Sequence, residues 1–122
     1  VFGSISIFNA ALGDAGQKAF WPELDPSGGI WEAGYCIGRS WWNRGLATEA
    51  LKAVTAYWFS HTDGDWLTCC HATANPASGR VMEKAGFVYH HDTVDHKFDG
   101  TPVECKSYLL TRDRYEHRKD LP

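Results

Sequence analysis

The segment that most constrains the fold is a short run at residues 66–73, WLTCCHAT. Its apolar and polar residues show little alternation, which is typical of a strand covered on both faces. Helical patterns flank it on both sides. Apolar residues recur at helical spacing from Leu46 to Phe59, and Asn75-Pro76 then opens a short helix. Strands of this kind lie in the centre of α/β sheets, so the sequence predicts an α/β fold.

The rest of the chain predicts a sheet of mixed pairing. Alternating residues at 1–9 and 30–38 predict two strands before the first helix. Two more strands follow the short helix, at about 87–94 and 103–110, joined through the turn Asp99-Gly100. Residues 13–29, rich in Gly and Pro, are predicted to be a loop, and residues 111–122 a charged, frayed tail. We find no internal repeat or second domain, so residues 1–122 are predicted to form a single domain.

Composition excludes several classes of protein. The chain has 122 residues, 43% of them hydrophobic, and a formal net charge of −3. It is too apolar to be disordered, and its weak acidity argues against a nucleic-acid binder that works by broad phosphate neutralisation. No apolar run approaches the roughly 20 residues of a membrane-spanning helix.

The cysteine pattern favours reduced thiols. The four cysteines, Cys36, Cys69, Cys70 and Cys105, include no C-x-x-C pair, which indicates a cytoplasmic location. A metal site at Cys69, Cys70 and His71 is conceivable. Consecutive strand residues point to opposite faces, however, so these three cannot converge on one ion, and we predict no metal.

The turn before the longer helix is the first candidate for chemistry. Residues 42–48, WNRGLAT, lie between a predicted strand and a predicted helix. Unpaired N–H groups and the helix dipole attract anions to such a position. Gly45 and Ala47 would let a phosphate approach the backbone, and Arg44 can add charge-assisted hydrogen bonds. The segment has neither the Walker nor the dinucleotide-binding spacing, so a tight connection without a ligand stays an alternative.

The short helix supplies the second candidate. Asn75 fits the N-cap, Pro76 the first helical position, and Gly86 the C-terminal stop. Ser78 shares the inward stripe of this helix with Met82 and two further residues, so its hydroxyl is predicted to face the interior. The alternative is a serine hydrogen-bonded to its own helix backbone.

Together these segments resemble the GNAT superfamily of N-acetyltransferases, and most closely its ribosomal-protein N-terminal acetyltransferase branch. That branch has Glu-x-Gly-Tyr on a strand, Trp-Gly-x-Gly-x-(Ala/Gly)-Thr-Glu-Ala at a helix start, then Asn-x-x-Ser and Glu-Lys-x-Gly-Phe. This sequence has Glu32-Ala33-Gly34-Tyr35, Trp42-Asn43-Arg44-Gly45-Leu46-Ala47-Thr48-Glu49-Ala50, Asn75-Pro76-Ala77-Ser78 and Glu83-Lys84-Ala85-Gly86-Phe87. Glu104 and Tyr108 also fit the final strand. The likeness covers about residues 1–115, and Asn43 departs from the usual glycine.

The resemblance implies a GNAT-like mixed sheet flanked by helices that binds acetyl-CoA as co-substrate, without a metal. The strands at 30–38 and 66–73 would splay apart to admit the pantetheine arm. The pyrophosphate would bind the backbone N–H groups of Arg44, Gly45, Leu46, Ala47 and Thr48. The backbone of Cys36, Ile37 and Gly38 would bind pantetheine and polarise the thioester carbonyl, an oxyanion-hole role.

The resemblance also implies roles for single side chains. Glu32 is the candidate base that deprotonates the attacking amine; the alternative is a solvent-facing or salt-bridged strand carboxylate. Many relatives place a tyrosine acid seven positions after the asparagine, where this chain has Met82. Ser78 is therefore the expected proton donor to the leaving thiolate, with Tyr108 a weaker alternative. Asn75 would hydrogen-bond the pantetheine.

The implied function is acetyl transfer to a primary amine, on a protein N-terminus or a small molecule, by direct attack. The alternative is a non-catalytic CoA-binding or interaction module, since Met82 has no proton to give. Complete domains of the family have about 150 residues or more, so the resemblance also implies that the first strand and two helices are missing. An exposed sheet edge would follow, and a homodimer is one way to cover it.

Overall fold

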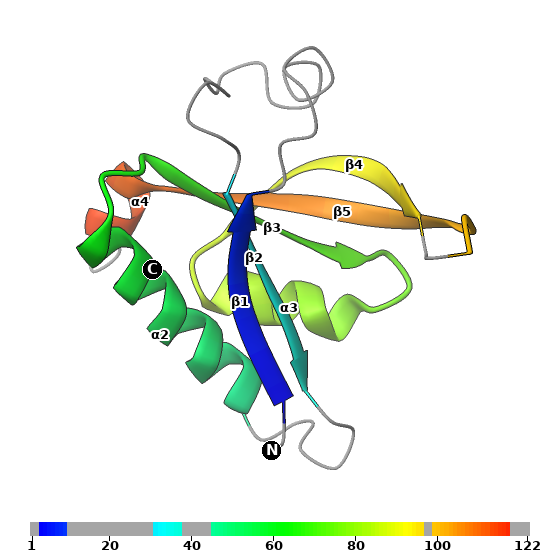
Figure 1. Cartoon of the computed structure of the whole chain (residues 1–122), viewed down its shortest axis with the longest axis horizontal. Helices are drawn as coiled ribbons and strands as arrows, with labels where there is room; N and C mark the ends of the chain where they lie inside the picture. The colour runs from blue at the N-terminus through cyan, green and yellow to red at the C-terminus, as the bar shows by residue number, and fades with distance from the viewer. Residues whose placement is uncertain (1–2, 10–30, 38–44, 97–98, 118–122) are drawn as a thin grey trace.

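The structure is a computed structural model that describes residues 3–9, 31–37, 45–96 and 99–117. Figure 1 shows the arrangement of the elements in space. In chain order they are β1 (Gly3–Asn9), β2 (Trp31–Ile37), α2 (Leu46–His61), β3 (Trp66–Ala72), α3 (Pro76–Lys84), β4 (Val88–His96), β5 (Pro102–Thr111) and α4 (Arg112–Glu116). The predicted order of five strands and two helices is confirmed, and a short helix, α4, follows the last strand.

The five strands form one mixed sheet in the order β1-β2-β3-β5-β4. β1 pairs antiparallel with β2, and β5 pairs antiparallel with both β3 and β4. β2 and β3 are parallel neighbours, with α2 as the connection between them. The predicted central strand is confirmed, because the side chains of β3 on both faces are largely buried.

Helices α2 and α3 pack on one face of the sheet, and α3 lies behind β1 and β2 in the view of Figure 1. The core joins them to alternate strand residues, and its fully buried members include Leu51 of α2, Met82 of α3, Leu67 of β3 and Leu110 of β5. The inward stripe predicted for α3 is confirmed, since Met82 is buried while Arg80, Glu83 and Lys84 are exposed. The apolar stripes of two helices thus cover one face of a shared sheet.

The ends of α3 also follow the sequence. The Asn75 side chain accepts a hydrogen bond from the Ser78 N–H, and Pro76 stands in the first turn. Gly86 has a φ of 102°, in the left-handed region that glycine adopts without strain. Gly100, at the predicted hairpin turn, has a φ of 87°.

The prediction of a frayed tail from residue 111 is wrong for residues 111–117. Thr111 caps the short helix α4, and the ring of Tyr115 stacks on Phe59 at 4.7 Å. Arg112 donates three side-chain hydrogen bonds of 2.8–2.9 Å, to the carbonyls of Gly64, Phe59 and Thr62. The charged residues suggested a solvated end. The Arg112 guanidinium instead donates hydrogen bonds to carbonyl groups at the end of α2 and just after it, which have no partner within the helix. Residues 118–122 and the predicted loop 13–29 lie outside the described residues.

Candidate active site

The parallel edge between β2 and β3 is paired over only two positions. Glu32 lies opposite Thr68, and Ala33 lies opposite Cys69. Two side chains add to this contact, because the Thr68 hydroxyl donates to the Trp31 carbonyl at 2.9 Å and the Cys69 thiol donates to the Ala33 carbonyl at 3.2 Å. Beyond Ala33, β2 continues in register with β1, while β3 beyond Cys69 continues in register with β5. The two parallel strands therefore diverge at this point, as the resemblance implied.

A pair of hydroxyl groups lies beside this divergence. The Tyr35 Oη lies 2.6 Å from the Ser78 Oγ and 3.2 Å from the Ser78 carbonyl oxygen. Ser78 belongs to the first turn of α3, and Tyr35 to the part of β2 that no longer pairs with β3. The Ser78 hydroxyl thus faces inward as predicted, toward β2 and not toward its own helix backbone. Burial raises the pKa of Tyr35 to about 12, so its hydroxyl stays protonated at neutral pH.

Glu32 approaches the same point from the other face of the sheet. It precedes Ala33 on β2, and successive strand side chains point to opposite faces. Glu32 is half-buried, and burial, followed by the nearby charge of Asp95, raises its pKa to about 6. Burial, with a smaller contribution from Glu32, raises the pKa of the neighbouring Cys70 thiol to about 12. The candidate base and the candidate proton donor therefore flank the divergence from opposite sides.

The start of α2 has the open geometry of an anion site. Gly45, its N-cap, has a φ of 74° and forms no side-chain cap. Among the described residues, no atom lies within 4 Å of the position that a side-chain Cβ at residue 45 would take. In the part of the chain that the structure describes, the N-cap thus supplies no side chain to the N–H groups of this turn, which are the kind of groups that bind anions. Arg44 and Gly38 lie outside the described residues, and of Cys36 and Ile37 only the backbone is described.

Two further predicted residues have contacts of their own. Asn75 is exposed, and its Oδ1 accepts from the Ser78 N–H at 3.4 Å, so the expected capping role is confirmed. Tyr108 is buried, and its hydroxyl donates to Glu83 Oε1 at 3.5 Å. Burial raises the pKa of Tyr108, and the Glu83 charge adds to the shift. The described structure thus connects Tyr108 to Glu83, and Ser78 to Tyr35.

Sequence reasoning assigned no part in the site to Tyr35, His71 or Gly79. The His71 Nδ1 lies 2.7 Å from the Ala72 carbonyl oxygen, and its buried Nε2 has no hydrogen-bond partner among the residues that the structure describes. Gly79 adjoins Ser78, and a Cβ there would lie 2.8 Å from the His71 Nε2. The one available signal was Tyr35 in the Glu-x-Gly-Tyr motif. Residue periodicity gives the face of a strand but no distance between two elements.

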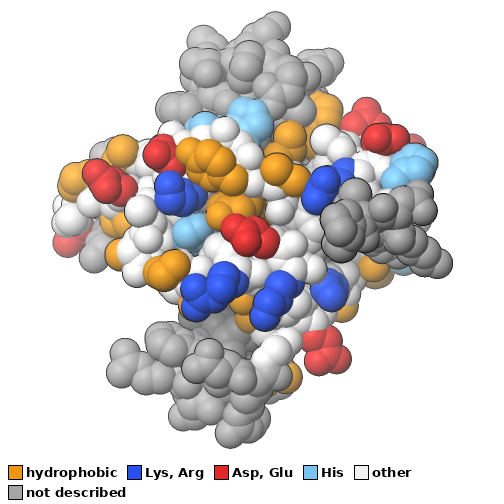
Figure 2. Space-filling model, turned by 180° about the vertical axis from the view of Figure 1, so that it is seen from behind, with side chains coloured by type: hydrophobic (Ala, Val, Ile, Leu, Met, Phe, Trp, Pro, Cys, Tyr) orange, Lys and Arg blue, Asp and Glu red, His pale blue; other side chains and the backbone are white. Residues whose placement is uncertain are grey.

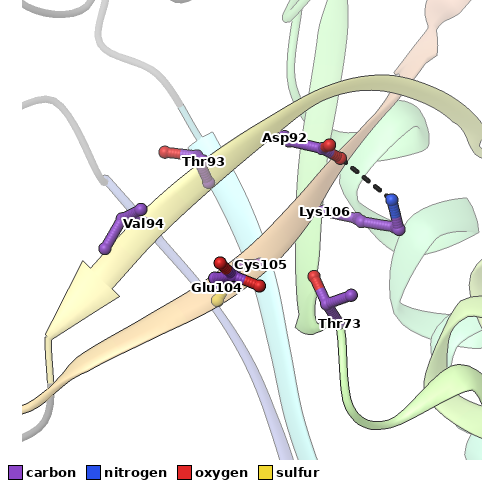
Figure 3. A pocket seen from close by; sticks show the side chains of 7 residues that line it. All are labelled: Thr73, Asp92, Thr93, Val94, Glu104, Cys105 and Lys106. Carbon is purple, nitrogen blue, oxygen red and sulfur yellow. Dashed lines mark hydrogen bonds and ion pairs between the residues drawn. The ribbon is translucent and has the colours of Figure 1, made fainter.

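A hollow of about 260 Å³ lies beside the β4–β5 hairpin. Figure 3 shows the seven side chains that line it, Thr73, Asp92, Thr93, Val94, Glu104, Cys105 and Lys106. Lys106 Nζ and Asp92 Oδ1, from paired positions of β5 and β4, form an ion pair at 3.0 Å at one side of it. The hollow is open, and none of the predicted catalytic residues lines it.

Neither a metal centre nor a membrane span is found in the described part of the chain. Its His, Cys, Asp and Glu side chains form no group of three that could hold an ion. Its helices include none long and apolar enough to cross a bilayer.

Comparison with known proteins decides the family. The sequence model of the acetyltransferase (GNAT) domain matches residues 3–88, which include the diverging strands, the start of α2 and all of α3. The chain belongs to the GNAT acetyltransferase family. A curated relative, the uncharacterized N-acetyltransferase YoaA of Bacillus subtilis (strain 168), is 30% identical over 84 residues, which are 68% of this chain and 48% of the relative. The chain thus spans about half the length of that relative.

Solved structures share the fold of this GNAT chain. The aminoglycoside acetyltransferase AAC(6')-Ib, in complex with coenzyme A and kanamycin, superposes with a TM-score of 0.70 at 20% identity, over 97% of this chain and 64% of the other. A spermidine N-acetyltransferase, SpeG of Vibrio cholerae, superposes with a TM-score of 0.64 at 20% identity, over 74% of this chain and 54% of the other. The predicted GNAT-like mixed sheet flanked by helices is confirmed.

Proposed function

We propose that this chain carries the acetyl-CoA site of an N-acetyltransferase that moves the acetyl group to a primary amine by direct attack. The observation that carries the proposal is the edge between β2 and β3, which pairs at two positions and then opens beside the Tyr35–Ser78 hydroxyl pair. Family membership supplies the class of reaction. The residues that flank the opening supply a base on one side and a hydrogen-bond donor on the other.

The cofactor would lie along the diverging strands. Its pyrophosphate would bind the N–H groups of residues 44–48, where α2 begins. Its pantetheine would follow the backbone of Cys36, Ile37 and Gly38, with Asn75 as a further hydrogen-bond partner. Figure 2 shows Lys and Arg side chains gathered on the face that carries the helices. The exposed cations of α2 and α3, Lys52, Arg80 and Lys84, add positive charge on the face that would receive the phosphates.

The two faces of the sheet would divide the chemistry. Glu32, with a pKa of about 6, is mostly ionised at pH 7 and could take the proton of the incoming ammonium from one face. Ser78, on the helix-bearing face, would donate a hydrogen bond to the sulfur as its charge develops. Tyr108 is the weaker candidate, since its hydroxyl is directed to Glu83.

The acceptor is proposed to be a primary amine. The fold relatives include proteins named for two amine substrates, an aminoglycoside and spermidine. The sequence motifs favour a protein N-terminus, as in the ribosomal-protein branch. We propose that residues 1–122 act as one domain in the cytoplasm, in keeping with the free thiols of Cys69, Cys70 and Cys105. A homodimer is the proposed assembly, which size measurement in solution would test.

Calorimetric titration of the chain with acetyl-CoA tests the cofactor site directly. We expect saturable binding, and no binding even at millimolar ligand would refute the proposal. Free-thiol release over a panel of amines and N-terminal peptides then tests transfer and identifies the acceptor. The alternative of a non-catalytic CoA-binding module is favoured by Met82, which is buried in the core and has no proton to give. Binding without turnover across the panel would support that alternative.

A further inference from the structure

The geometry of the Tyr35–Ser78 pair restricts where its two protons can go. The Tyr35 hydroxyl can donate one proton, and Ser78 offers it two acceptors, the Oγ at 2.6 Å and the carbonyl oxygen at 3.2 Å. Hydrogen bonds between hydroxyl and oxygen have lengths of about 2.5–3.0 Å. The 2.6 Å contact is met whichever hydroxyl donates, whereas the carbonyl lies just beyond the usual range, so the long carbonyl contact favours donation by Tyr35 to the Oγ.

The direction of this bond decides what Ser78 can do. If Tyr35 donates to the Ser78 Oγ, the Ser78 proton must point away from Tyr35 and is available to another acceptor. If Tyr35 donates to the carbonyl, Ser78 instead donates its hydrogen bond to the Tyr35 oxygen, and its proton is not available to another acceptor. The ring of Tyr35 packs against the hydrophobic core, which fixes its position. It can therefore direct the Ser78 hydroxyl without moving itself.

We propose that Tyr35 is a positioning residue, which donates its proton to the Ser78 Oγ and so directs the Ser78 proton toward the sulfur of the leaving CoA. This role rests on the proposed function. As the amine nitrogen bonds to the acetyl carbon, the carbon–sulfur bond breaks and its electron pair stays on sulfur. Glu32 takes one proton from the ammonium before the attack, and the nitrogen releases its second proton to water as the amide forms. The sulfur, stabilised by the Ser78 hydrogen bond, departs as a thiolate and takes its proton from water.

Acidities explain why the pair donates a hydrogen bond and keeps its protons. An alkyl thiol such as that of cysteine has a pKa of about 8.5, whereas that of Tyr35 is about 12. Transfer of the Tyr35 proton through Ser78 to the thiolate would thus be unfavourable by a factor of more than about a thousand. A directed hydrogen bond to a developing charge avoids this barrier, and it is the contribution made by donors of the oxyanion-hole type.

The test is the pKa of the thiol of bound CoA, followed by the ultraviolet absorbance of the thiolate as a difference from the ligand-free protein. This measurement needs no acceptor. We expect bound CoA to ionise at lower pH than free CoA, and Tyr35→Phe to raise the thiol pKa by about one unit, a tenfold change in the ionisation constant. Ser78→Ala should raise it by at least as much. Because Tyr35 acts through Ser78, the double variant should match Ser78→Ala alone.

Several outcomes would overturn the inference. A Tyr35→Phe effect that persists in full in the Ser78→Ala background would mean that Tyr35 acts directly or only through packing. An unshifted thiol pKa in Tyr35→Phe would mean that it has no part. Ser78→Thr, which keeps the hydroxyl, should retain the dependence on Tyr35. Tyr57→Phe is the matched control, because Tyr57 is 63% exposed on α2 and its loss should leave the thiol pKa unchanged.

The same experiment separates this inference from the proposed function. A chain that binds no CoA refutes both. A chain that binds CoA without transferring acetyl refutes only the transfer, and the thiol pKa still decides the role of Tyr35. A chain that transfers acetyl with a thiol pKa indifferent to Tyr35 refutes only the positioning role.

Discussion

The two edges of β3 differ in how they are held. Along its β5 edge, backbone pairs run without interruption from Trp66–Thr111 to Ala72–Cys105. Along its β2 edge, pairing covers two positions, and the side chains of Thr68 and Cys69 bond to carbonyls of β2. β3 is thus fully paired with β5 along one edge, the closed edge, and only partly paired with β2 along the other, the open edge. Glu32 and Tyr35, two titratable groups with candidate roles, stand on the open side, whereas the weaker candidate Tyr108 stands on the closed one.

This difference separates stability from function. A complete ladder fixes two strands relative to each other, and apolar side chains bury its face. An incomplete ladder leaves backbone groups free for a ligand. An ionised carboxylate that is partly buried there lowers the free energy of unfolding, because burial disfavours its charge. Variants on the open edge should therefore affect chemistry more than stability, and variants on the closed edge the reverse.

The largest expected effect is that of Glu32→Gln on turnover. General base catalysis contributes about 10²–10⁴-fold, so kcat with acetyl-CoA and an amine should fall at least about a hundredfold. In the parent chain, turnover should decline as pH falls through about 6, because protonated Glu32 cannot accept the ammonium proton. The variant should lack this acid limb. A decline with the same midpoint in the variant would assign the titration to another group.

Glu32→Gln should lower turnover but raise the stability of the fold at neutral pH. The pKa of Glu32 is raised from 4.5 to about 6 in the folded chain, so folding favours its protonated form. The resulting penalty is absent below about pH 4.5, grows as pH rises toward 6 and is complete above it, at about 2 kcal/mol. Thermal unfolding should therefore show the variant to be more stable than the parent at pH 7, and no more stable at pH 4.

The sequence predicted the parts of this site that depend on local chemistry. Asn75-Pro76 and Gly86 set the ends of α3, and helical periodicity placed Ser78 on the inner face. The contact between Ser78 and Tyr35 could not be predicted, because it joins residues 43 positions apart whose separation depends on how far two strands diverge. The docking of Arg112 escaped for a similar reason, since its partners are backbone carbonyls, which no side-chain pattern reveals.

On the closed edge, Leu110→Ala should have the largest effect on stability. Leu110 is 1% exposed and lies opposite Leu67. Removing a buried leucine costs about 2–5 kcal/mol, which denaturant unfolding would measure. Acetyl-CoA affinity per folded molecule should be unchanged. Val94→Ala, on the same hairpin but 54% exposed, is the matched control and should cost little. A fall in affinity with Leu110→Ala would show that the two edges are coupled.

Gly79→Ala probes the packing beneath the first turn of α3. A Cβ there would lie 2.8 Å from the His71 Nε2 and 3.2 Å from the Tyr108 hydroxyl. His71 is buried and bonded to the Ala72 carbonyl, so it cannot yield easily. Overpacking of this kind costs about 1–3 kcal/mol, which exceeds or balances the gain of about 1 kcal/mol in helix propensity. Urea unfolding should therefore show a net loss of about 1 kcal/mol.

The sign of the Gly79→Ala effect should reverse once the obstacle is removed. In a His71→Ala background the Cβ has room, and the same substitution should stabilise by up to about 1 kcal/mol through helix propensity alone. A loss that persists in that background would place the restraint elsewhere, for example at Tyr108.

The smallest expected effects are those of two helix caps. Asn75 caps α3 at the open edge with a bond of 3.4 Å, and Thr111 caps α4 at the closed edge with a bond of 3.2 Å. Replacing either by alanine should cost about 0.5–1 kcal/mol of unfolding free energy. Acetyl-CoA titration should distinguish them, because Asn75 is also proposed to bond the pantetheine and Thr111 is not. Equal affinities in Asn75→Ala and Thr111→Ala would reduce Asn75 to a cap, and the open edge would then bind its cofactor through backbone groups and Ser78 alone.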